Sequence, residues 1–296
     1  MNREGIVQRL AEPNVVILDG PMGTELVSRG LLSNTHLWVS DTLTTHPEMV
    51  RELHEEYIES GAEIITTNTF RTNTRAFKNA GINDRSEELT LKAIEIAKEA
   101  IEDHKSDKKI FVAGSISPVE DCYRPDLVPG RRELNKEHKL MMEYMIKGGV
   151  DFVLLETMCS LREAQVVMKI ANRVSMPALA SFVGSKDGKL LSGESFSAIK
   201  EFVEDYKPIG IMVNCTPWNI IGEPIDYLCE NLNVPIGVSA NIGYDDSTKG
   251  RNNEKFIQPD EYAKWAIKWR EMGVKIIGSC CGTNPDYTKA LKEKIS

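Results

Sequence analysis

The sequence predicts an α/β fold, a TIM-like (β/α)8 barrel whose long strand-to-helix loops lie at its C-terminal face. Short apolar runs rich in β-branched residues alternate eight times with segments of helical periodicity along the 296 residues. The runs are apolar throughout, as strands of a parallel sheet are when both faces are buried. An open doubly wound sheet is the alternative, and it is disfavoured because no G-x-G-x-x-G follows the first run.

Each strand is expected in an apolar run, and each helix in the periodic segment that follows it. Proline begins several of these helices and glycine follows several others, which is typical of helix boundaries. The expected strands are residues 15–20, 63–70, 109–117, 152–158, 177–184, 209–215, 234–241 and 275–281. The expected helices are residues 47–60, 86–103, 134–148, 160–173, 195–206, 220–231, 259–272 and 285–295.

The connections between these elements differ in length according to their direction. Helix-to-strand connections are short, whereas strand-to-helix connections are long at 21–46, 118–133 and 242–258. In a barrel these long loops share the C-terminal face, where active sites are built. No low-complexity linker divides the chain, so residues 1–296 are expected to form a single barrel domain.

Composition and charge exclude two classes of partner. The net charge is −8 and no basic cluster is present, which argues against a nucleic-acid surface. No apolar run approaches the roughly 20 residues of a membrane span.

The N-terminal residues are polar and carry no export signal, so a cytoplasmic protein is expected. Its six cysteines would then be reduced and available for metal binding or catalysis.

Polar or metal-binding residues end nearly every predicted strand. A single Asp or Asn at such a place is most often a structural cap. A barrel, however, gathers all these positions into one ring, and a functional site explains their number better. The residues are Asp19, Asn68 and Thr69, Ser115 and Ser117, Glu156 and Thr157, Cys215, Asn241, and the pair Cys280 and Cys281.

Three cysteines among these strand ends suggest a metal centre. Cys215 ends one strand, and Cys280 with Cys281 ends the last. Three thiolates that meet at one rim would form a three-cysteine site with a free fourth position, the arrangement that a catalytic zinc requires. The alternative is that some of them are buried free cysteines, which pack as small hydrophobic residues.

The motifs that hold these residues resemble the homocysteine S-methyltransferase family. The motifs DGPMGTEL, TTNTF, LLETM, VNCTP, SANIG and GSCCGT occur in order from residue 18 to residue 283. Asn-Cys followed far downstream by Gly-x-Cys-Cys-Gly is the specific part of the match. The resemblance implies a (β/α)8 barrel that binds homocysteine and holds zinc through three cysteines.

The resemblance also implies roles for individual residues. Cys215, Cys280 and Cys281 would be the zinc ligands and the catalytic centre. The candidate substrate-binding residues are Asp19, Gly20, Asn68, Glu156 and Asn241. Asp19 and Glu156 would lie near the homocysteine ammonium, the Asp19-Gly20 turn near its polar end, and Asn241 beside the metal or at its fourth position. Thr67 and Ala240 depart from the residues usual in the family.

The implied activity is that of an enzyme, a zinc-dependent homocysteine S-methyltransferase. Zinc deprotonates a bound thiol, and three cysteinates give the site a negative charge that keeps the bound sulfur nucleophilic. A negative site favours a cationic methyl donor such as S-methylmethionine. Trp38, Tyr123 and Trp218 lie in strand-to-helix loops and could shape a pocket for that cation.

Other functions remain as alternatives. The chain could be a subunit that exchanges methyl groups with a separate corrinoid protein. A structural-zinc or metal-storage protein is less favoured, because structural zinc usually has four protein ligands. A redox-active Cys280–Cys281 pair ranks low, since adjacent cysteines rarely form an unstrained disulfide. The sequence leaves open the methyl donor, the choice between homocysteine and selenohomocysteine, and the oligomeric state.

Outside the site, His54 lies in an amphipathic segment and is expected at the surface.

Overall fold

The computed structural model describes residues 4–31, 36–104, 109–243 and 256–295. Its eight strands are all parallel and pair in the order β1-β8-β7-β6-β5-β4-β3-β2. A parallel bridge between Leu18 and Ile64 joins β1 to β2 and brings the two ends of the sheet together. The predicted (β/α)8 barrel is therefore confirmed. The strands are β1 Val16–Ile17, β2 Ile64–Thr66, β3 Phe111–Ile116, β4 Phe152–Met158, β5 Ala178–Phe182, β6 Gly210–Pro217, β7 Ile236–Asn241 and β8 Ile276–Ser279.

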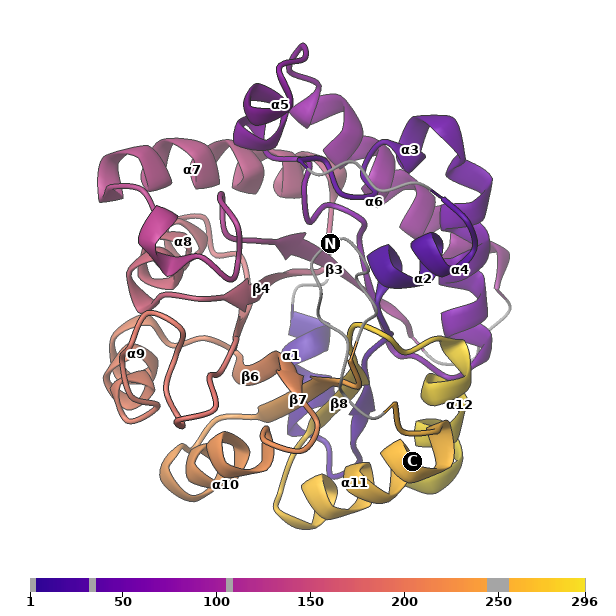
Figure 1. The fold of residues 1–296 in the computed structure, drawn as a ribbon, viewed down its shortest axis with the longest axis vertical. Coiled ribbons are helices and arrows are strands. Elements are labelled where there is room, and N and C mark those ends of the chain that lie inside the picture. The colour runs from indigo at the N-terminus through magenta and orange to yellow at the C-terminus, as the bar shows by residue number, and fades with distance from the viewer. Residues whose placement is uncertain (1–3, 32–35, 105–108, 244–255, 296) are drawn as a thin grey trace.

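All eight predicted helices are present, and they form a ring around the strands (Figure 1). Their ends agree with the predicted ends to within about one turn, and four of the eight begin at a predicted proline or end beside a predicted glycine. The helices are α4 Pro47–Glu59, α6 Ser86–Asp103, α7 Arg131–Gly148, α8 Leu161–Arg173, α9 Ala198–Tyr206, α10 Gly222–Asn231, α11 Pro259–Glu271 and α12 Pro285–Ile295.

The predicted long loops contain short helices that the periodicity did not reveal. They hold α2 Met22–Ser28, α3 Thr42–Thr45 and the 3-10 turn η1 Pro125–Leu127, and α5 Thr74–Ala80 follows β2. Elements of seven residues or fewer give too few turns for a periodic pattern to stand out. The third long loop falls mostly on residues 244–255, outside the described residues. Among those described, no helix is long and apolar enough to cross a membrane.

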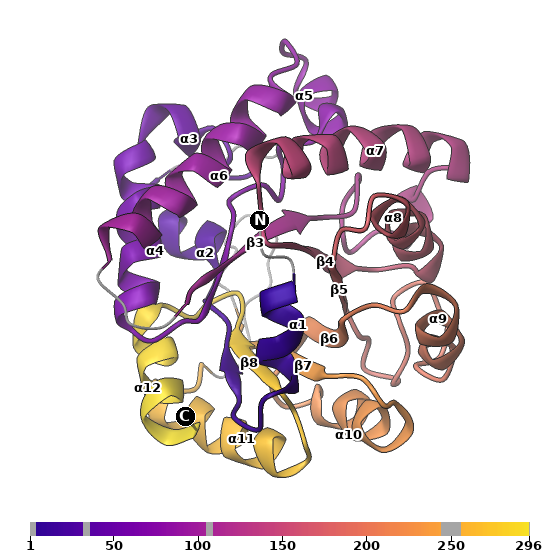
Figure 2. The same cartoon turned by 180° about the vertical axis from the view of Figure 1, so that it is seen from behind.

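The N-terminal end of the barrel is closed by α1 (Glu4–Ala11). Figure 2 shows α1 lying across the strands at this end. Ile6 and Leu10 pack with apolar residues from inside the barrel, among them Phe152 and Leu154. The Arg9 side chain binds the Glu63 carboxylate at 2.9 Å and fixes the helix to the start of β2. The site that the strand ends form therefore lies at the opposite, C-terminal end.

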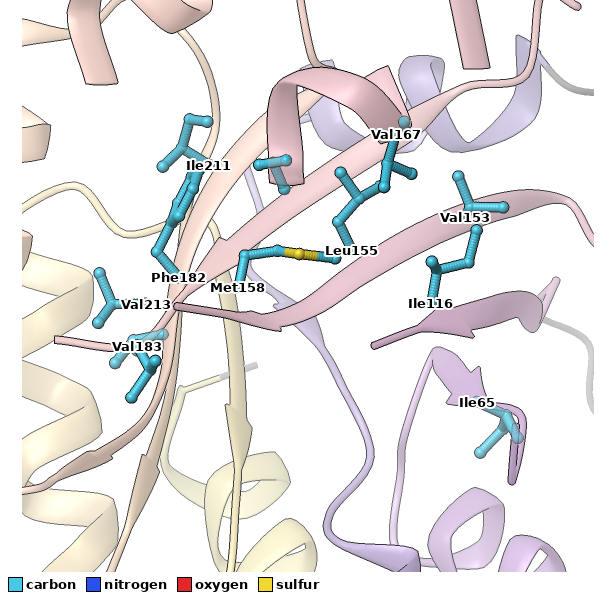
Figure 3. Close-up of a cluster of buried hydrophobic side chains, with 14 of the residues drawn as sticks. Ile65, Ile116, Val153, Leu155, Met158, Val167, Phe182, Val183, Ile211 and Val213 are labelled. Atoms are coloured by element: carbon cyan, nitrogen blue, oxygen red, sulfur yellow. The ribbon is translucent and has the colours of Figure 1, made fainter. Parts of the chain in front are cut away.

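A second apolar layer lies between the barrel and the helices. It includes Val153 and Leu155 of β4, whereas Phe152 and Leu154 of the same strand belong to the barrel interior. Figure 3 shows this outer layer around Leu155 and Val167. Side chains on a strand alternate between its two faces. The next residue on the inner face after Leu154 is Glu156, at the mouth of the barrel.

Candidate metal and substrate site

A cavity of about 1130 Å³ occupies the C-terminal mouth of the barrel. It is large enough for two substrates of amino-acid size. Its walls come from all parts of the chain, because each strand ends here. The structure brings every predicted site residue to this cavity: Asp19, Gly20, Asn68, Glu156, Cys215, Asn241, Cys280 and Cys281.

The three cysteines of the predicted metal centre form one cluster. Their sulfur atoms lie within 4.8 Å of one another. The Sγ atom of Cys281 is 3.9 Å from that of Cys215 and 4.0 Å from that of Cys280. Sulfurs that bind one zinc ion tetrahedrally at about 2.3 Å are about 3.8 Å apart. The cluster therefore already has the spacing that a tetrahedral metal requires.

The thiols interact with one another as well. Hydrogen bonds from the Cys215 and Cys280 thiols lower the pKa of the Cys281 thiol. A thiolate is thus favoured at this sulfur by its neighbours. The pKa of the Cys280 thiol is raised in turn by its hydrogen bonds with Cys215 and Cys281, so the cluster favours a thiolate, the form that binds metal, at Cys281.

An irregular backbone directs Cys215 toward the cavity. On β6, Met212 faces the barrel interior and Val213 the helices, so strict alternation would turn Cys215 to the helix side. The register of β6 against β7 shifts between Asn214 and Pro217, and Cys215 has a left-handed φ of 48°. Bulges and strained backbone of this kind re-aim side chains at functional sites.

The turn after β8 positions the other two thiols. The amide of Cys280 donates to the carbonyl of Ala240 at 2.9 Å, which fixes the turn to the end of β7. Gly282 follows with φ of 89°, and a Cβ atom there would lie 1.9 Å from the carbonyl oxygen of Gly243. Only glycine fits this position, so the turn requires Gly282 directly after Cys280 and Cys281.

Asn241 borders the thiol cluster with an unused acceptor. Its Nδ2 atom donates to the carbonyl oxygen of Cys215 at 2.9 Å. Its Oδ1 atom is buried and has no hydrogen-bond partner among the described residues. Buried polar atoms are normally satisfied, so an oxygen left open beside three sulfurs fits the predicted place of Asn241 at the fourth position of a metal.

Two buried carboxylates face the same cavity. Asp19 accepts hydrogen bonds from the Thr66 amide at 2.7 Å and the Thr66 hydroxyl at 2.9 Å. Glu156 accepts one from the Ser115 hydroxyl at 2.7 Å. Burial raises the pKa of each carboxyl to about 7, against the opposing effect of these hydrogen bonds. The negative charge of Glu156 adds to the rise at Asp19. A cationic ligand would restore both to the ionised form.

Asn68 and Arg71 both follow β2 and both line the cavity. Asn68 is 4% exposed, and its Nδ2 atom has no hydrogen-bond partner in the described part of the chain. Arg71 lines the cavity three residues further on, and its Nη1 group donates to the carbonyls of Pro118 and Glu120. The sequence reasoning did not single out Arg71. A basic residue directly after a strand-end motif was the signal that could have found it.

Asn214 belongs to the Asn-Cys motif that the sequence analysis named, but it was given no role there. Its Oδ1 atom accepts from the Thr157 amide at 3.1 Å and the Ser181 hydroxyl at 2.6 Å. Its Nδ2 atom donates to the Thr157 hydroxyl at 2.8 Å. The signal was available, because Asn214 is a polar residue inside an apolar strand and directly precedes Cys215.

Of the three aromatic residues predicted to shape a cation pocket, two reach the cavity. Trp38 and Tyr123 are among its lining residues. Trp218 is not among the described lining residues and packs instead on Trp265, with ring centroids 5.3 Å apart. An aromatic pocket for a cation would therefore be built from the loops that follow β1 and β3.

Comparison with known proteins agrees with this geometry. The sequence model of the homocysteine S-methyltransferase family matches residues 16–295. Homocysteine S-methyltransferase 1 of Arabidopsis thaliana is 28% identical over 94% of this chain and 93% of its own length. Homocysteine S-methyltransferase YbgG of Bacillus subtilis is 28% identical over the same shares. The selenocysteine methyltransferase of Astragalus bisulcatus is 26% identical, covering 95% of this chain and 92% of its own.

A solved structure shows the same fold. The metallated form of the homocysteine methyltransferase MmuM from Escherichia coli superposes with a TM-score of 0.84. The comparison covers 99% of both chains at 23% identity. With a family match that spans nearly the whole sequence, this chain belongs to the homocysteine S-methyltransferase family.

Proposed function

We propose that the protein transfers a methyl group from a cationic donor to the thiol of homocysteine, with zinc as its metal, and forms methionine. One observation carries the proposal: three thiols at metal spacing share a cavity with two buried carboxylates. The thiols suit a metal that activates sulfur, and the carboxylates suit the ammonium of an amino acid. Family membership supports the same reaction.

Cys215, Cys280 and Cys281 would hold the zinc, with the open Oδ1 atom of Asn241 beside its fourth position. Thiolate ligands favour zinc over hard cations such as Mg²⁺. When bound, zinc supplies a substrate thiol in its deprotonated, nucleophilic form at neutral pH.

Glu156 and Asp19 would bind the homocysteine ammonium, with Glu156 as the main contact. Both are buried, and a buried cation requires an anionic partner. The backbone of the turn from Gly20 to Gly23 lines the same cavity next to Asp19 and is assigned to the homocysteine carboxylate. These contacts would orient the sulfur toward the thiol cluster.

The reaction itself is a displacement at carbon. The homocysteine sulfur forms a bond to the methyl carbon, and the bond from that carbon to the sulfonium sulfur or ammonium nitrogen of the donor breaks. The electron pair of the broken bond leaves with the donor, whose onium centre becomes neutral. Buried carboxylates and the thiol cluster line the cavity, and their ionised forms would attract a cationic donor.

The test is a donor screen with the zinc-loaded protein and homocysteine. S-methylmethionine, S-adenosylmethionine, betaine and methylcobalamin are supplied separately, and methionine is measured by mass spectrometry. Methionine from an onium donor supports the proposal, whereas methionine from methylcobalamin alone favours the corrinoid alternative. Bound zinc without methionine from any donor would favour a structural metal. Selenohomocysteine in a parallel series tests the second acceptor.

A further inference from the structure

The wall of the cavity carries a positively charged side chain, Arg71, that has no role in the methyl transfer proposed at the thiols. Among the described lining residues, the charged side chains are mostly acidic: Asp19, Glu120, Asp121 and Glu156. Lys186 also lines the cavity, but it is exposed to solvent. Arg71 is half-buried, so its positive charge acts inside the cavity. The Gly20–Gly23 turn, to which the homocysteine carboxylate is assigned, lines the same cavity but contains no arginine.

The structure holds Arg71 in one place. Its Nη1 group donates to the Pro118 carbonyl at 3.1 Å and to the Glu120 carbonyl at 2.8 Å. The residues around it form a turn in which the Thr72 amide donates to the Thr69 carbonyl. The Nε and Nη2 groups donate to none of the described residues. An arginine fixed by one nitrogen, with its other donors open, is prepared for a planar anion such as a carboxylate.

Asn68 supplies a second open donor in the same segment. Its side chain is buried at 4% exposure, and its Nδ2 atom has no partner among the described residues. A buried amide nitrogen can be satisfied only by a hydrogen-bond acceptor. Asn68 lines the same cavity as Arg71 and lies three residues before it.

We propose that Asn68 and Arg71 bind the carboxylate of the methyl donor, so that the enzyme selects zwitterionic donors, sulfonium or quaternary ammonium compounds that carry a carboxylate. The inference rests on the proposed function. The homocysteine carboxylate is assigned to the turn beside Asp19, so these two donors belong to the second substrate. The cavity, at about 1130 Å³, has room for both.

The experiment compares donors that differ only in the carboxylate. S-methyl-L-methionine is paired with S-methyl-L-methioninamide, and betaine with betaine amide. The amides keep the shape and the onium charge but lose the negative charge. The unmodified protein should use the carboxylate member of its productive pair with at least about tenfold higher kcat/KM, mainly through KM for the donor.

Variants at the subsite should remove this preference. In Arg71→Met the carboxylate-to-amide ratio should fall toward one, Arg71→Lys should keep part of it, and Asn68→Ala should reduce it several-fold. The KM for homocysteine should not change. Circular dichroism and thermal unfolding show whether each variant is folded. If Arg71→Met does not fold, the donor preference is compared in Arg71→Lys instead.

Arg75→Met is the matched control. Arg75 binds Glu120, Glu133 and Glu137, so it holds the same loop as Arg71, but it is not among the described residues that line the cavity. Its loss should leave the carboxylate-to-amide ratio unchanged even if both rates fall. An equal fall of the ratio in both variants would mean that loop order alone sets the preference, which overturns the proposal.

Other outcomes distinguish a failure of the donor subsite from a failure of the proposed function. Methionine formed equally from both members of a pair overturns this inference and leaves the proposed function standing. A raised KM for homocysteine in Arg71→Met, with the donor ratio intact, assigns the subsite to homocysteine and overturns the donor assignment. Methionine from no donor at all overturns the proposed function and this inference together.

Discussion

Asn214 and Thr157 are joined by two hydrogen bonds in opposite directions. The Asn214 amide oxygen accepts from the Thr157 backbone amide, and its nitrogen donates to the Thr157 hydroxyl. Thr157 follows Glu156 and has a left-handed φ of 57°, while Cys215 follows Asn214 and has a φ of 48°. One side chain thus fixes the two strained strand ends that carry a proposed ammonium contact and a proposed metal ligand.

Replacing Asn214 should therefore weaken metal binding without removing a ligand. In Asn214→Ala we expect zinc affinity to fall by about 10- to 100-fold, the usual effect of losing a residue that orients a ligand. Competition with a chromophoric chelator measures this. Asn231→Ala, on the exposed end of α10, is the matched control and should keep full affinity. Unchanged affinity in Asn214→Ala would show that Cys215 holds its orientation alone.

The cysteines of the cluster should each be necessary for the metal. Changing Cys215, Cys280 or Cys281 to Ser should reduce zinc from about one per chain to a small fraction, because a hydroxyl is a poor zinc ligand compared with a thiolate. Metal analysis after gel filtration gives the stoichiometry. Cys229→Ser is the control, since Cys229 lies half-buried on α10 away from the cluster. Full zinc in all three cluster variants would contradict the assignment.

The sequence predicted the elements and the cluster because each depended on a local pattern. Strand β4 has the bounds of its apolar run, and helix α6 has the bounds of its segment of helical periodicity. Cys215 and Asn241 could be placed together since the ends of parallel strands must meet at one edge of a barrel. The direction of Cys215 could not be predicted, because the left-handed backbone that turns it inward occurs where the register of β6 shifts against β7 and where Asn214 bonds to Thr157 of β4, and these partners are distant in sequence.

His54 is a case in which the helical pattern indicated the correct position but the polarity of the residue suggested the wrong one. The buried residues of α4 are Val50, Leu53, His54, Tyr57 and Ile58, an i, i+3, i+4, i+7, i+8 stripe. His54 lies on this apolar stripe and is fully buried, so its predicted surface position is wrong. The helical period predicted burial, and the polarity of histidine was given too much weight.

Glu156→Gln should weaken homocysteine binding and change its pH dependence. We expect a loss of about 2–4 kcal/mol, the effect of leaving the ammonium poorly paired. With the pKa of Glu156 and Asp19 raised to about 7, both carboxyls gain charge as pH rises through 7. Affinity in the unmodified protein should therefore increase from pH 6 to pH 8, and less so in the variant.

Calorimetry at several pH values measures both effects on homocysteine binding. A thiol of similar length without the amino group is the control ligand, and its affinity should hardly differ between the two proteins. Homocysteine affinity that is the same in both proteins would place the ammonium elsewhere.

His54 should make the protein less stable in mild acid. Burial lowers the pKa of His54 to about 3, compared with about 6.5 in the unfolded chain. Between these values the unfolded state binds one more proton, so the free energy of unfolding rises with pH and is lost as pH falls below about 6.5. At pH 5 this loss amounts to about 2 kcal/mol. His54→Leu should abolish it and should also remove two buried ring nitrogens that have no partner among the described residues.

Urea unfolding at pH 7.5, 6.0 and 5.0 tests this expectation. The difference in free energy of unfolding between His54→Leu and the unmodified protein should grow by about 2 kcal/mol from the highest to the lowest pH. Other groups titrate equally in both proteins and cancel in the difference. A difference that stays constant over this range would mean that His54 becomes protonated inside the folded protein.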